Sequence, residues 1–352
     1  MQQLKPFQQL LVCATLLFMG SVSAAAELRV VTHASFDLPK PLIERFEQES
    51  GVSLRVVKAG DTGEMVNKLI LSKGSPIGDV VYGIDNSLLG RARSAGILDA
   101  LPASLRGLPV AEGMGAEGIA LSGAQDWLPI DWGYVTLNAD KAWFAKHSMD
   151  LPKTLDDLAK AEYAKLLVVQ NPATSSPGMA FLLATASAKG ESVWDWWAQL
   201  RQGGVKVANS WSDAYYKDFS LNGGDRPLVV SYASSPAAEV FYSDPKKVES
   251  PTANVFLPGG VFLQVEGVAR LKGGQQPEAA AQFMRFMRSV EVQQALQTTM
   301  WMWPVQPDVA MDPVMSHAGK LPPVAAQAAM GVDDIAASAE AWRRRFAQVV
   351  LR

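Results

Sequence analysis

The chain has 352 residues, 48% of them hydrophobic and 19% charged, and its net charge at pH 7 is −3. This composition supports packed cores and excludes extended disorder, and the length allows two domains of roughly 100–200 residues each. No run rich in lysine and arginine occurs, so nucleic acid is not expected as a partner. One cysteine and three histidines exclude a multi-cysteine zinc site, an iron–sulfur cluster and a disulfide framework.

The first 26 residues have the pattern of a secretory signal peptide. Lys5 is the only charge before Glu27, an apolar stretch over 10–19 follows it, and small residues precede Glu27. The apolar stretch is too short to span a bilayer. Cys13 lies within this segment, so cleavage would leave an exported mature chain without cysteine.

Short β-branched runs then alternate with stretches of helical periodicity. The pattern predicts strands over 28–32, 53–57 and 79–82, and helices over 39–50, 64–72 and 88–95. Further along it predicts strands over 165–170, 205–208, 228–232 and 262–266, and helices over 178–188, 191–201, 212–221 and 277–287. Alternation of this kind is typical of an α/β fold with mostly parallel sheets.

Two extended segments, 128–134 and 262–266, suggest that the chain crosses twice between two lobes. We therefore expect a discontinuous first lobe made of 27–128 and 267–318 and a second lobe made of 129–266. A C-terminal helical segment, 319–352, would pack on both lobes. A ligand cleft would then lie between the lobes.

Catalytic motifs are missing from the sequence. There is no Gly-x-Ser-x-Gly pentapeptide and no glycine-rich phosphate loop. His33, His147 and His317 are scattered, without the spacing of metal ligands. We expect a protein that is not an enzyme and has no metal site and no cofactor.

Polar residues follow two of the predicted strands. Asp85 comes just after the strand over 79–82, at the carboxyl end where open α/β sheets bind ligands. It could equally form an Asx turn or cap the next helix. Ser175 and Ser176 precede Pro177 at the start of a predicted helix, where free backbone N–H groups could bind an anion or a polar group, although simple capping also explains them.

Aromatic residues gather beside these strand ends and loops. Trp211 and Tyr215 are four residues apart in a predicted helix, and the adjacent Tyr215 and Tyr216 cannot both face inward. Tyr232 ends a strand, and Trp301 lies in a segment without helical pattern. Such rings are often core residues, but an aromatic cleft with one acid would suit a flat cationic ligand.

In sequence order, seven segments together resemble the thiamine-binding periplasmic proteins of ABC importers, which have the two-lobed type II periplasmic-binding-protein fold. They are Asp79-Val-Val-Tyr-Gly-Ile-Asp-Asn-Ser-Leu-Leu89, Pro129-Ile-Asp-Trp-Gly-Tyr134, Asn171-Pro-Ala-Thr-Ser-Ser-Pro-Gly178, Trp211-Ser-Asp-Ala-Tyr215, Leu228-Val-Val-Ser-Tyr-Ala-Ser-Ser-Pro236, Phe262-Leu-Gln-Val-Glu266 and Trp301-Met-Trp-Pro-Val305.

The resemblance implies a monomeric periplasmic protein that captures thiamine or its phosphates between two lobes and delivers it to a membrane permease. It implies that Asp85 lies near the cationic ligand and that Ser175 and Ser176 face the hydroxyethyl or phosphate end. The rings would be enclosed by the aromatic set Trp211, Tyr215, Tyr232 and Trp301.

The chain also departs from the family pattern. His33 and Ala34 stand where relatives often have an aromatic–acid pair, so the ligand could be another cationic heterocycle. Adjacent Tyr215 and Tyr216 leave open a ferric-ion binding protein of the same fold. A thiamine-degrading enzyme is disfavoured, because its chemistry resembles displacement by a cysteine that the mature chain lacks.

Overall fold

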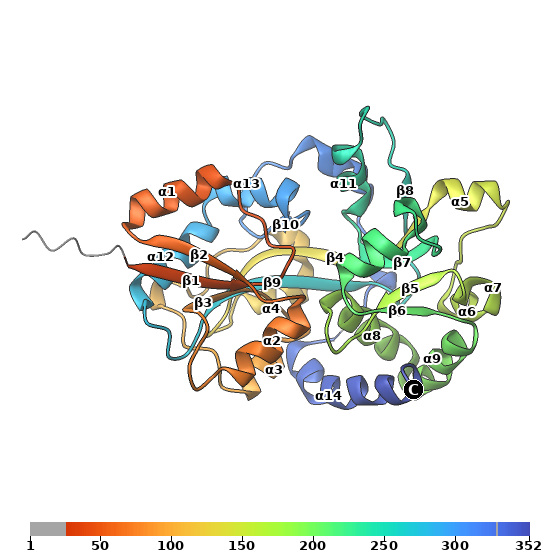
Figure 1. Cartoon of the computed structure of the whole chain (residues 1–352), viewed down its shortest axis with the longest axis horizontal. Coiled ribbons are helices and arrows are strands. Elements are labelled where there is room, and N and C mark those ends of the chain that lie inside the picture. Colours follow the sequence, from red (N-terminus) through yellow and green to blue (C-terminus); the bar gives the residue numbers. More distant parts are fainter. Residues whose placement is uncertain (1–25, 329) are drawn as a thin grey trace, which may run out of the picture.

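The computed structural model describes residues 26–328 and 330–352, so the predicted signal peptide lies outside the described residues except for Ala26. Within the described part, no helix combines the length and apolar character needed to cross a membrane. Figure 1 shows two halves joined by long central strands.

Among the described residues, a mixed sheet of ten strands extends through both halves (Figure 1). Its order is β2 (Ser53–Lys58), β1 (Glu27–Thr32), β3 (Val80–Asp85), β9 (Phe262–Arg270), β4 (Leu128–Asp140), β7 (Leu228–Tyr232), β5 (Leu167–Gln170) and β6 (Lys206–Ala208). Two short strands, β8 (Thr252–Val255) and β10 (Trp303–Pro304), also pair with β4. Strand β1 is parallel to β2 and β3, and β5 is parallel to β6 and β7, whereas β4 and β9 run antiparallel to their neighbours. Each lobe therefore has a parallel set of strands, and the antiparallel pair joins them.

The two extended segments predicted from sequence are confirmed as parts of β4 and β9, and both strands are longer than predicted. Almost every residue of the two strands is buried, because they run through the centre of the molecule. Gly267 of β9 lies opposite a register shift in β3, and the indole of Trp127 fills the space that a Cβ on Gly267 would occupy. The Nε1 of Trp127 donates to the Ile84 carbonyl over 2.8 Å, which ties β3 to the segment entering β4.

Helices of the first lobe cover the parallel set β2–β1–β3. Their bounds are α1 (Lys40–Ser50), α2 (Thr62–Leu71), α3 (Leu89–Ser94), α4 (Gly115–Leu121), α12 (Pro277–Met287) and α13 (Val290–Thr299). Helix α1 begins after Pro39 and ends at Gly51, whose φ of 68° is the left-handed conformation that favours glycine. Phe46 of α1 packs against Phe283 and Phe286 of α12, which closes one face of this lobe.

The second lobe has helices on both sides of β7–β5–β6. They are α5 (Lys141–Lys146), α6 (Leu155–Ala159), α7 (Ala161–Ala164), α8 (Ser176–Lys189), α9 (Val193–Gln202), α10 (Trp211–Asp213) and α11 (Ser235–Tyr242). Helix α8 is apolar on all sides and buried from Ser176 to Ala186. The C-terminal helix α14 (Val332–Val349) contacts α3 of the first lobe and α8 and α9 of the second, along the lower side of Figure 1.

The prediction of one regular helix over 212–221 is wrong. The chain forms the short α10, then a π-helical turn over Ala214–Asp218 and a 3-10 turn over Ser220–Asn222. Gly223, at a φ of 92°, ends the segment, and the Asn222 side chain donates to the Tyr215 carbonyl over 2.9 Å. Wide π turns recur at functional sites because they reorient side chains that a regular helix would align. Other 3-10 turns span Ala103–Leu105, Glu112–Met114, Gly190–Ser192, Pro313–Ala318 and Val324–Ala326.

Candidate functional site

A cavity of about 800 Å³ lies between the two lobes. The first lobe contributes the loop after β1, the start of α2 and the segment before β10, and the second lobe contributes the π turn and α11. Four of the seven residues predicted to bind the ligand line this cavity: Trp211, Tyr215, Tyr232 and Trp301.

Three of these rings form one side of the cavity. Trp211 stacks on Tyr215 with ring centroids 5.0 Å apart and planes 21° apart, and Tyr232 lies 6.5 Å from Trp211 at a steep angle. The indole N–H of Trp211 donates to the Ser231 hydroxyl over 2.8 Å, which fixes the ring orientation. A preformed aromatic surface of this kind can stack on a planar ligand.

Trp301 contributes from the opposite lobe. Its φ of 57° is unusual for a residue with a side chain, and strained backbone of this kind clusters at ligand sites. The indole lies 5.3 Å from the ring of Phe241 and 5.6 Å from that of Tyr242, both on α11. Rings of the two lobes therefore meet at one edge of the cavity.

Tyr215 and Tyr216 point in different directions, as the sequence predicted. Tyr215 is buried and donates its hydroxyl to Glu239 over 2.8 Å, whereas Tyr216 is 58% exposed. Burial, followed by the negative charge of Glu239, raises the pKa of both phenols, which works against the phenolate form that ferric iron requires. In the described residues, no group of three or more histidine, cysteine or acidic side chains could hold a metal ion.

Asp85 does not line the cavity. It is fully buried, and its Oδ1 accepts hydrogen bonds from the backbone N–H and the hydroxyl of Ser87, which is the Asx-turn alternative weighed from the sequence. Burial raises its pKa to about 7, and the nearby charge of Glu266 contributes, against the opposing hydrogen bonds of Ser87. Glu266 is the register partner of Asp85 on β9, and it is Glu266 that lines the cavity.

Ser175 and Ser176 are buried at the start of α8 and also lie outside the cavity lining, although Pro177 is part of it. The helix N-cap is Ser175 rather than Ser176, and neither hydroxyl has a hydrogen-bond partner among the described residues. The Ser234 hydroxyl at the start of α11 is similarly buried without a partner, and Ser234 does line the cavity.

Four acids that sequence reasoning missed line the cavity: Asp61, Glu239, Asp244 and Glu266. Asp61 is the N-cap of α2, and its position between a predicted strand and a predicted helix was a usable signal. Glu266 ends the predicted extended segment 262–266, where an acid in an otherwise buried run is itself unusual. Glu239 lies within α11 and had no distinguishing pattern in the sequence.

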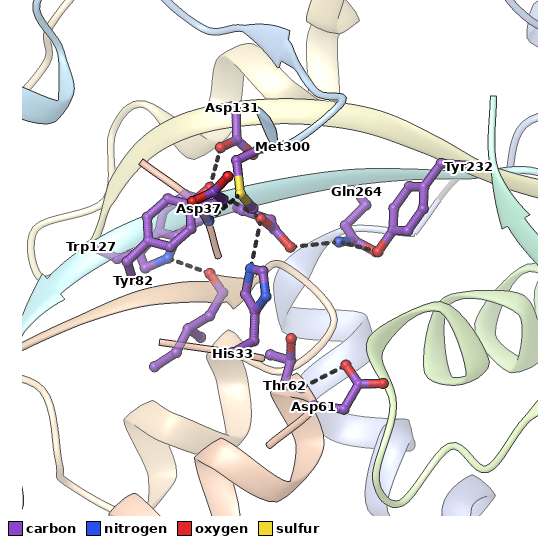
Figure 2. A network of polar contacts seen from close by, with 12 residues as sticks. His33, Asp37, Asp61, Thr62, Tyr82, Trp127, Asp131, Tyr232, Gln264 and Met300 are labelled. Carbon is purple, nitrogen blue, oxygen red and sulfur yellow. Dashed lines mark hydrogen bonds and ion pairs between the residues drawn. The ribbon is translucent and has the colours of Figure 1, made fainter. Parts of the chain in front are cut away.

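Glu266 takes part in a buried polar network whose other members, among them His33, Tyr82 and Gln264, are labelled in Figure 2. The Glu266 carboxylate accepts from Gln264 Nε2 over 3.0 Å and from the Tyr82 hydroxyl over 3.3 Å, and its Oε2 lies 3.5 Å from His33 Nε2. Gln264 also donates to the Tyr232 hydroxyl over 3.2 Å, so the network reaches the aromatic side of the cavity.

Asp131 lies at the inner end of the same network. The Tyr82 hydroxyl bonds to its carboxyl group, and Asp131 is the register partner of Glu266 where β4 and β9 cross. Burial, then the charge of Glu266, raises the pKa of Asp131 well above its ordinary value. The central strands thus place Glu266 at the wall of the cavity and Asp131 in the interior behind it.

Two lobes joined by a pair of central strands, with an aromatic and acidic cavity between them, define a solute-binding protein of the type II periplasmic class. The chain belongs to the family of bacterial extracellular solute-binding proteins, whose family model matches residues 41–323.

Relatives within this class confirm the resemblance stated from the sequence. The chain is 30% identical over 344 residues to the thiamine-binding periplasmic protein of Escherichia coli (strain K12), covering 96% of this chain and 97% of that protein. It is 26% identical to the thiamine-binding periplasmic protein of Brucella melitensis, covering 81% of this chain and 80% of that protein.

Solved structures agree. A periplasmic thiamin binding protein superposes with a TM-score of 0.77 at 28% identity, covering 93% of this chain and 96% of that chain. Iron-bound HitA from Pseudomonas aeruginosa superposes with a TM-score of 0.70 at 22% identity, covering 91% of this chain and 99% of that chain, and this likeness shows the shared fold alone.

Proposed function

We propose that this protein captures thiamine in the periplasm and delivers it to the membrane permease of an ABC importer, as a monomer and without catalysing a reaction. The observation that carries the proposal is the combination of stacked aromatic rings and four carboxyl side chains in one interlobe cavity. A planar cation gains both from stacking and from facing negative charge. The names of the relatives support thiamine over other planar cations.

In this proposal Trp211, Tyr215, Tyr232 and Trp301 enclose the rings of thiamine. Asp61 and Glu266 face its positive charge directly, and Asp85 acts from behind Glu266 rather than by contact. The lobes, 27–128 with 267–318 on one side and 129–266 on the other, close over the ligand.

The hydroxyethyl end of thiamine, or the phosphate of a thiamine phosphate, would lie toward the starts of α8 and α11. The unpartnered hydroxyls of Ser175, Ser176 and Ser234 support this orientation, because buried hydroxyls are normally hydrogen-bonded. Helix N-termini also favour negative charge.

Two measurements test the proposal. Mass spectrometry of protein purified under native conditions should find retained thiamine or a thiamine phosphate. Calorimetric titration of the mature protein with thiamine and with its mono- and diphosphate should give micromolar or tighter binding of at least one of them. Absence of binding for all three would refute the proposal.

The aromatic contact has its own test. Trp211→Ala should weaken thiamine binding by about 2 kcal/mol or more, roughly 30-fold, as expected for a buried aromatic anchor. Trp143→Ala is the matched control, because Trp143 stacks on His147 and lies outside the cavity lining. Calorimetry on both variants checks the prediction, and equal affinities would remove Trp211 from the site.

A further inference from the structure

His33 occupies a space built for its imidazole at the end of β1. The ring is buried and lies 5.8 Å from the ring of Tyr82. Gly83 has a φ of 96°, and a Cβ on it would come within 2.3 Å of the His33 ring, so the absence of a side chain there leaves room for the imidazole. His33 also lines the interlobe cavity.

The charged groups that act on His33 are acidic on each element packed against it. Glu266 approaches from β9, Asp61 from the start of α2 and Asp85 from the end of β3. The other titratable neighbours in the network, Tyr82 and Tyr232, are phenols with pKa values raised well above the ordinary value by burial, so they stay neutral. Burial lowers the pKa of His33, but the negative charge of Glu266, with Asp61 and Asp85, outweighs it, and the pKa is raised overall.

The Tyr82 hydroxyl lies between the carboxyl groups of Asp131 and Glu266. One phenol proton lies between two carboxyl groups and cannot be donated to both. Asp131 is fully buried and does not line the cavity, and burial raises its pKa well above the ordinary value, which favours its neutral form. Glu266 is the acid of this pair that lines the cavity, so it is the one that the His33 imidazole and a bound cation can both face.

The contact between His33 and Glu266 is long enough for another cation to replace the imidazolium. At 3.5 Å, the Nε2 of His33 is beyond good hydrogen-bond geometry with Glu266 Oε2, and it has no other partner among the described residues. The pair faces the cavity, and a cation placed there would compete with the imidazolium for the same carboxylate.

We propose that His33 carries a proton in the empty cleft as the exchangeable counter-cation of Glu266, and that binding of a cationic ligand expels this proton. The proposal rests on the proposed function, because it needs a cationic ligand in this cavity. It makes His33 a specificity-determining residue. A cationic ligand interacts with the Glu266 carboxylate in place of the imidazolium, whereas a neutral ligand gains no such interaction. Affinity for the cation then rises with pH across the range in which His33 loses its proton, by at most about tenfold per pH unit for one proton.

The number of protons released on binding is measured by calorimetric titration of the full mature chain with thiamine in buffers of different ionisation enthalpy. The titrations run from about pH 6 to about pH 8, around the ordinary pKa of histidine. The wild type should release a fraction of one proton per thiamine bound. His33→Gln keeps a polar side chain of similar size and should bind with less or no proton release and a flatter pH profile. His147→Gln is the matched control, since His147 is exposed and stacks on Trp143 outside the cavity.

A second measurement needs no ligand. The three histidines can be followed by NMR, and His33 is assigned by its loss in His33→Gln. In the free protein, His33 should titrate above the ordinary range for histidine, and Glu266→Gln should lower its pKa.

The outcomes separate the two proposals. Thiamine binding without proton release, or with equal release in wild type and His33→Gln, overturns the exchange and leaves the proposed function standing. An ordinary or lowered His33 titration in the free protein also overturns the exchange alone. Absence of thiamine binding at every pH refutes both.

Discussion

Asp61 is the residue that most directly links the two lobes across the cleft. Its Oδ1 accepts from the first backbone N–H of α2 over 2.8 Å, and its Oδ2 accepts from the backbone N–H of Trp211 over 3.0 Å. One carboxylate therefore serves a helix of the first lobe and the aromatic side of the second. The two bonds use the two different oxygens of the carboxylate.

This dual role gives a prediction at the residue scale. Asp61→Asn keeps one acceptor oxygen and so can still cap α2, but it loses the bond to Trp211 and the negative charge. Thiamine affinity should fall by about 2 kcal/mol, the range for a hydrogen bond to a charged group, while thermal stability changes little. Calorimetry and thermal unfolding of the ligand-free variant test this.

Asp61→Ala is the comparison, because it removes the cap as well. It should lose similar affinity and, in addition, about 1 kcal/mol of stability. Unchanged affinity in both variants would contradict the role of Asp61 in the site.

Residue types in the candidate site were only partly predictable. Trp211, Tyr215, Tyr232 and Trp301 line the cavity as the family resemblance implied, although their position beside loops and strand ends alone did not distinguish them from core residues. The pairing of Asp85 with Glu266 was not predictable, because the two residues are far apart in the chain and are neighbours only through the pairing of β3 with β9.

At the scale of elements, Asp79 ties β1, β3 and the segment before α12 together. Its carboxylate accepts from the backbone and side chain of Arg29, with the closest side-chain contact at 3.1 Å, and from the backbone N–H of Gln275 over 2.8 Å. Burial would raise the pKa of Asp79, but the hydrogen bonds from Arg29 and Gln275 outweigh it, and the pKa lies below its ordinary value.

Asp79→Asn should therefore destabilise the protein by about 2–3 kcal/mol near neutral pH, measured by urea unfolding. A group with a lowered folded pKa stabilises fully above its unfolded pKa, near 4, and loses this contribution as pH falls through the folded value. The difference between wild type and variant should stay constant from about pH 5 to about pH 8 and shrink below about pH 4.

An exposed pair is the control for this prediction. Glu49→Gln breaks the contact with Arg45 within α1, where the Glu49 side chain is 62% exposed, and should cost less than about 0.5 kcal/mol. An Asp79→Asn effect no larger than this would mean that the three-element junction contributes little to stability.

Elements with strong local signals were predicted well. Strand β7 and helix α12 have the predicted bounds, because β-branched runs and apolar periodicity are local properties. The helix over 212–221 was wrong, since nothing in its periodicity reveals the π turn that Asn222 and Gly223 stabilise. Strand β10, with only two residues, exists through its pairing with β4 and had no pattern of its own.

On the scale of the whole molecule, further contacts link the lobes besides the central strands and the hydrogen bond from Trp211 to Asp61, and two of them can be compared. The start of α2 contacts the turn before α8, where Glu64 donates its backbone N–H to the Thr174 carbonyl over 3.2 Å. Helix α14 lies across helices of both lobes (Figure 1). The first contact borders the cavity and the second lies away from it, so ligand binding and overall stability can be separated by mutation.

Phe346 of α14 is the residue to test this separation. It is 1% exposed and packs edge-on against Trp197 of α9, with ring centroids 4.8 Å apart. Phe346→Ala removes the ring from a packed core and should destabilise the protein by about 3–5 kcal/mol in urea unfolding. Thiamine affinity, measured by calorimetry below the unfolding range, should stay within about threefold of wild type.

The surface of the same helix supplies the control. Arg344→Ala removes a side chain that is 70% exposed and paired with Glu340, and it should change stability by less than about 0.5 kcal/mol. Saturating thiamine should restore part of the stability of Phe346→Ala, about 2.7 kcal/mol at one hundred times the dissociation constant, because ligand binds only the folded state. A large loss of affinity in Phe346→Ala would instead mean that α14 sets the geometry of the cleft, and that the two lobes are not positioned by the central strands alone.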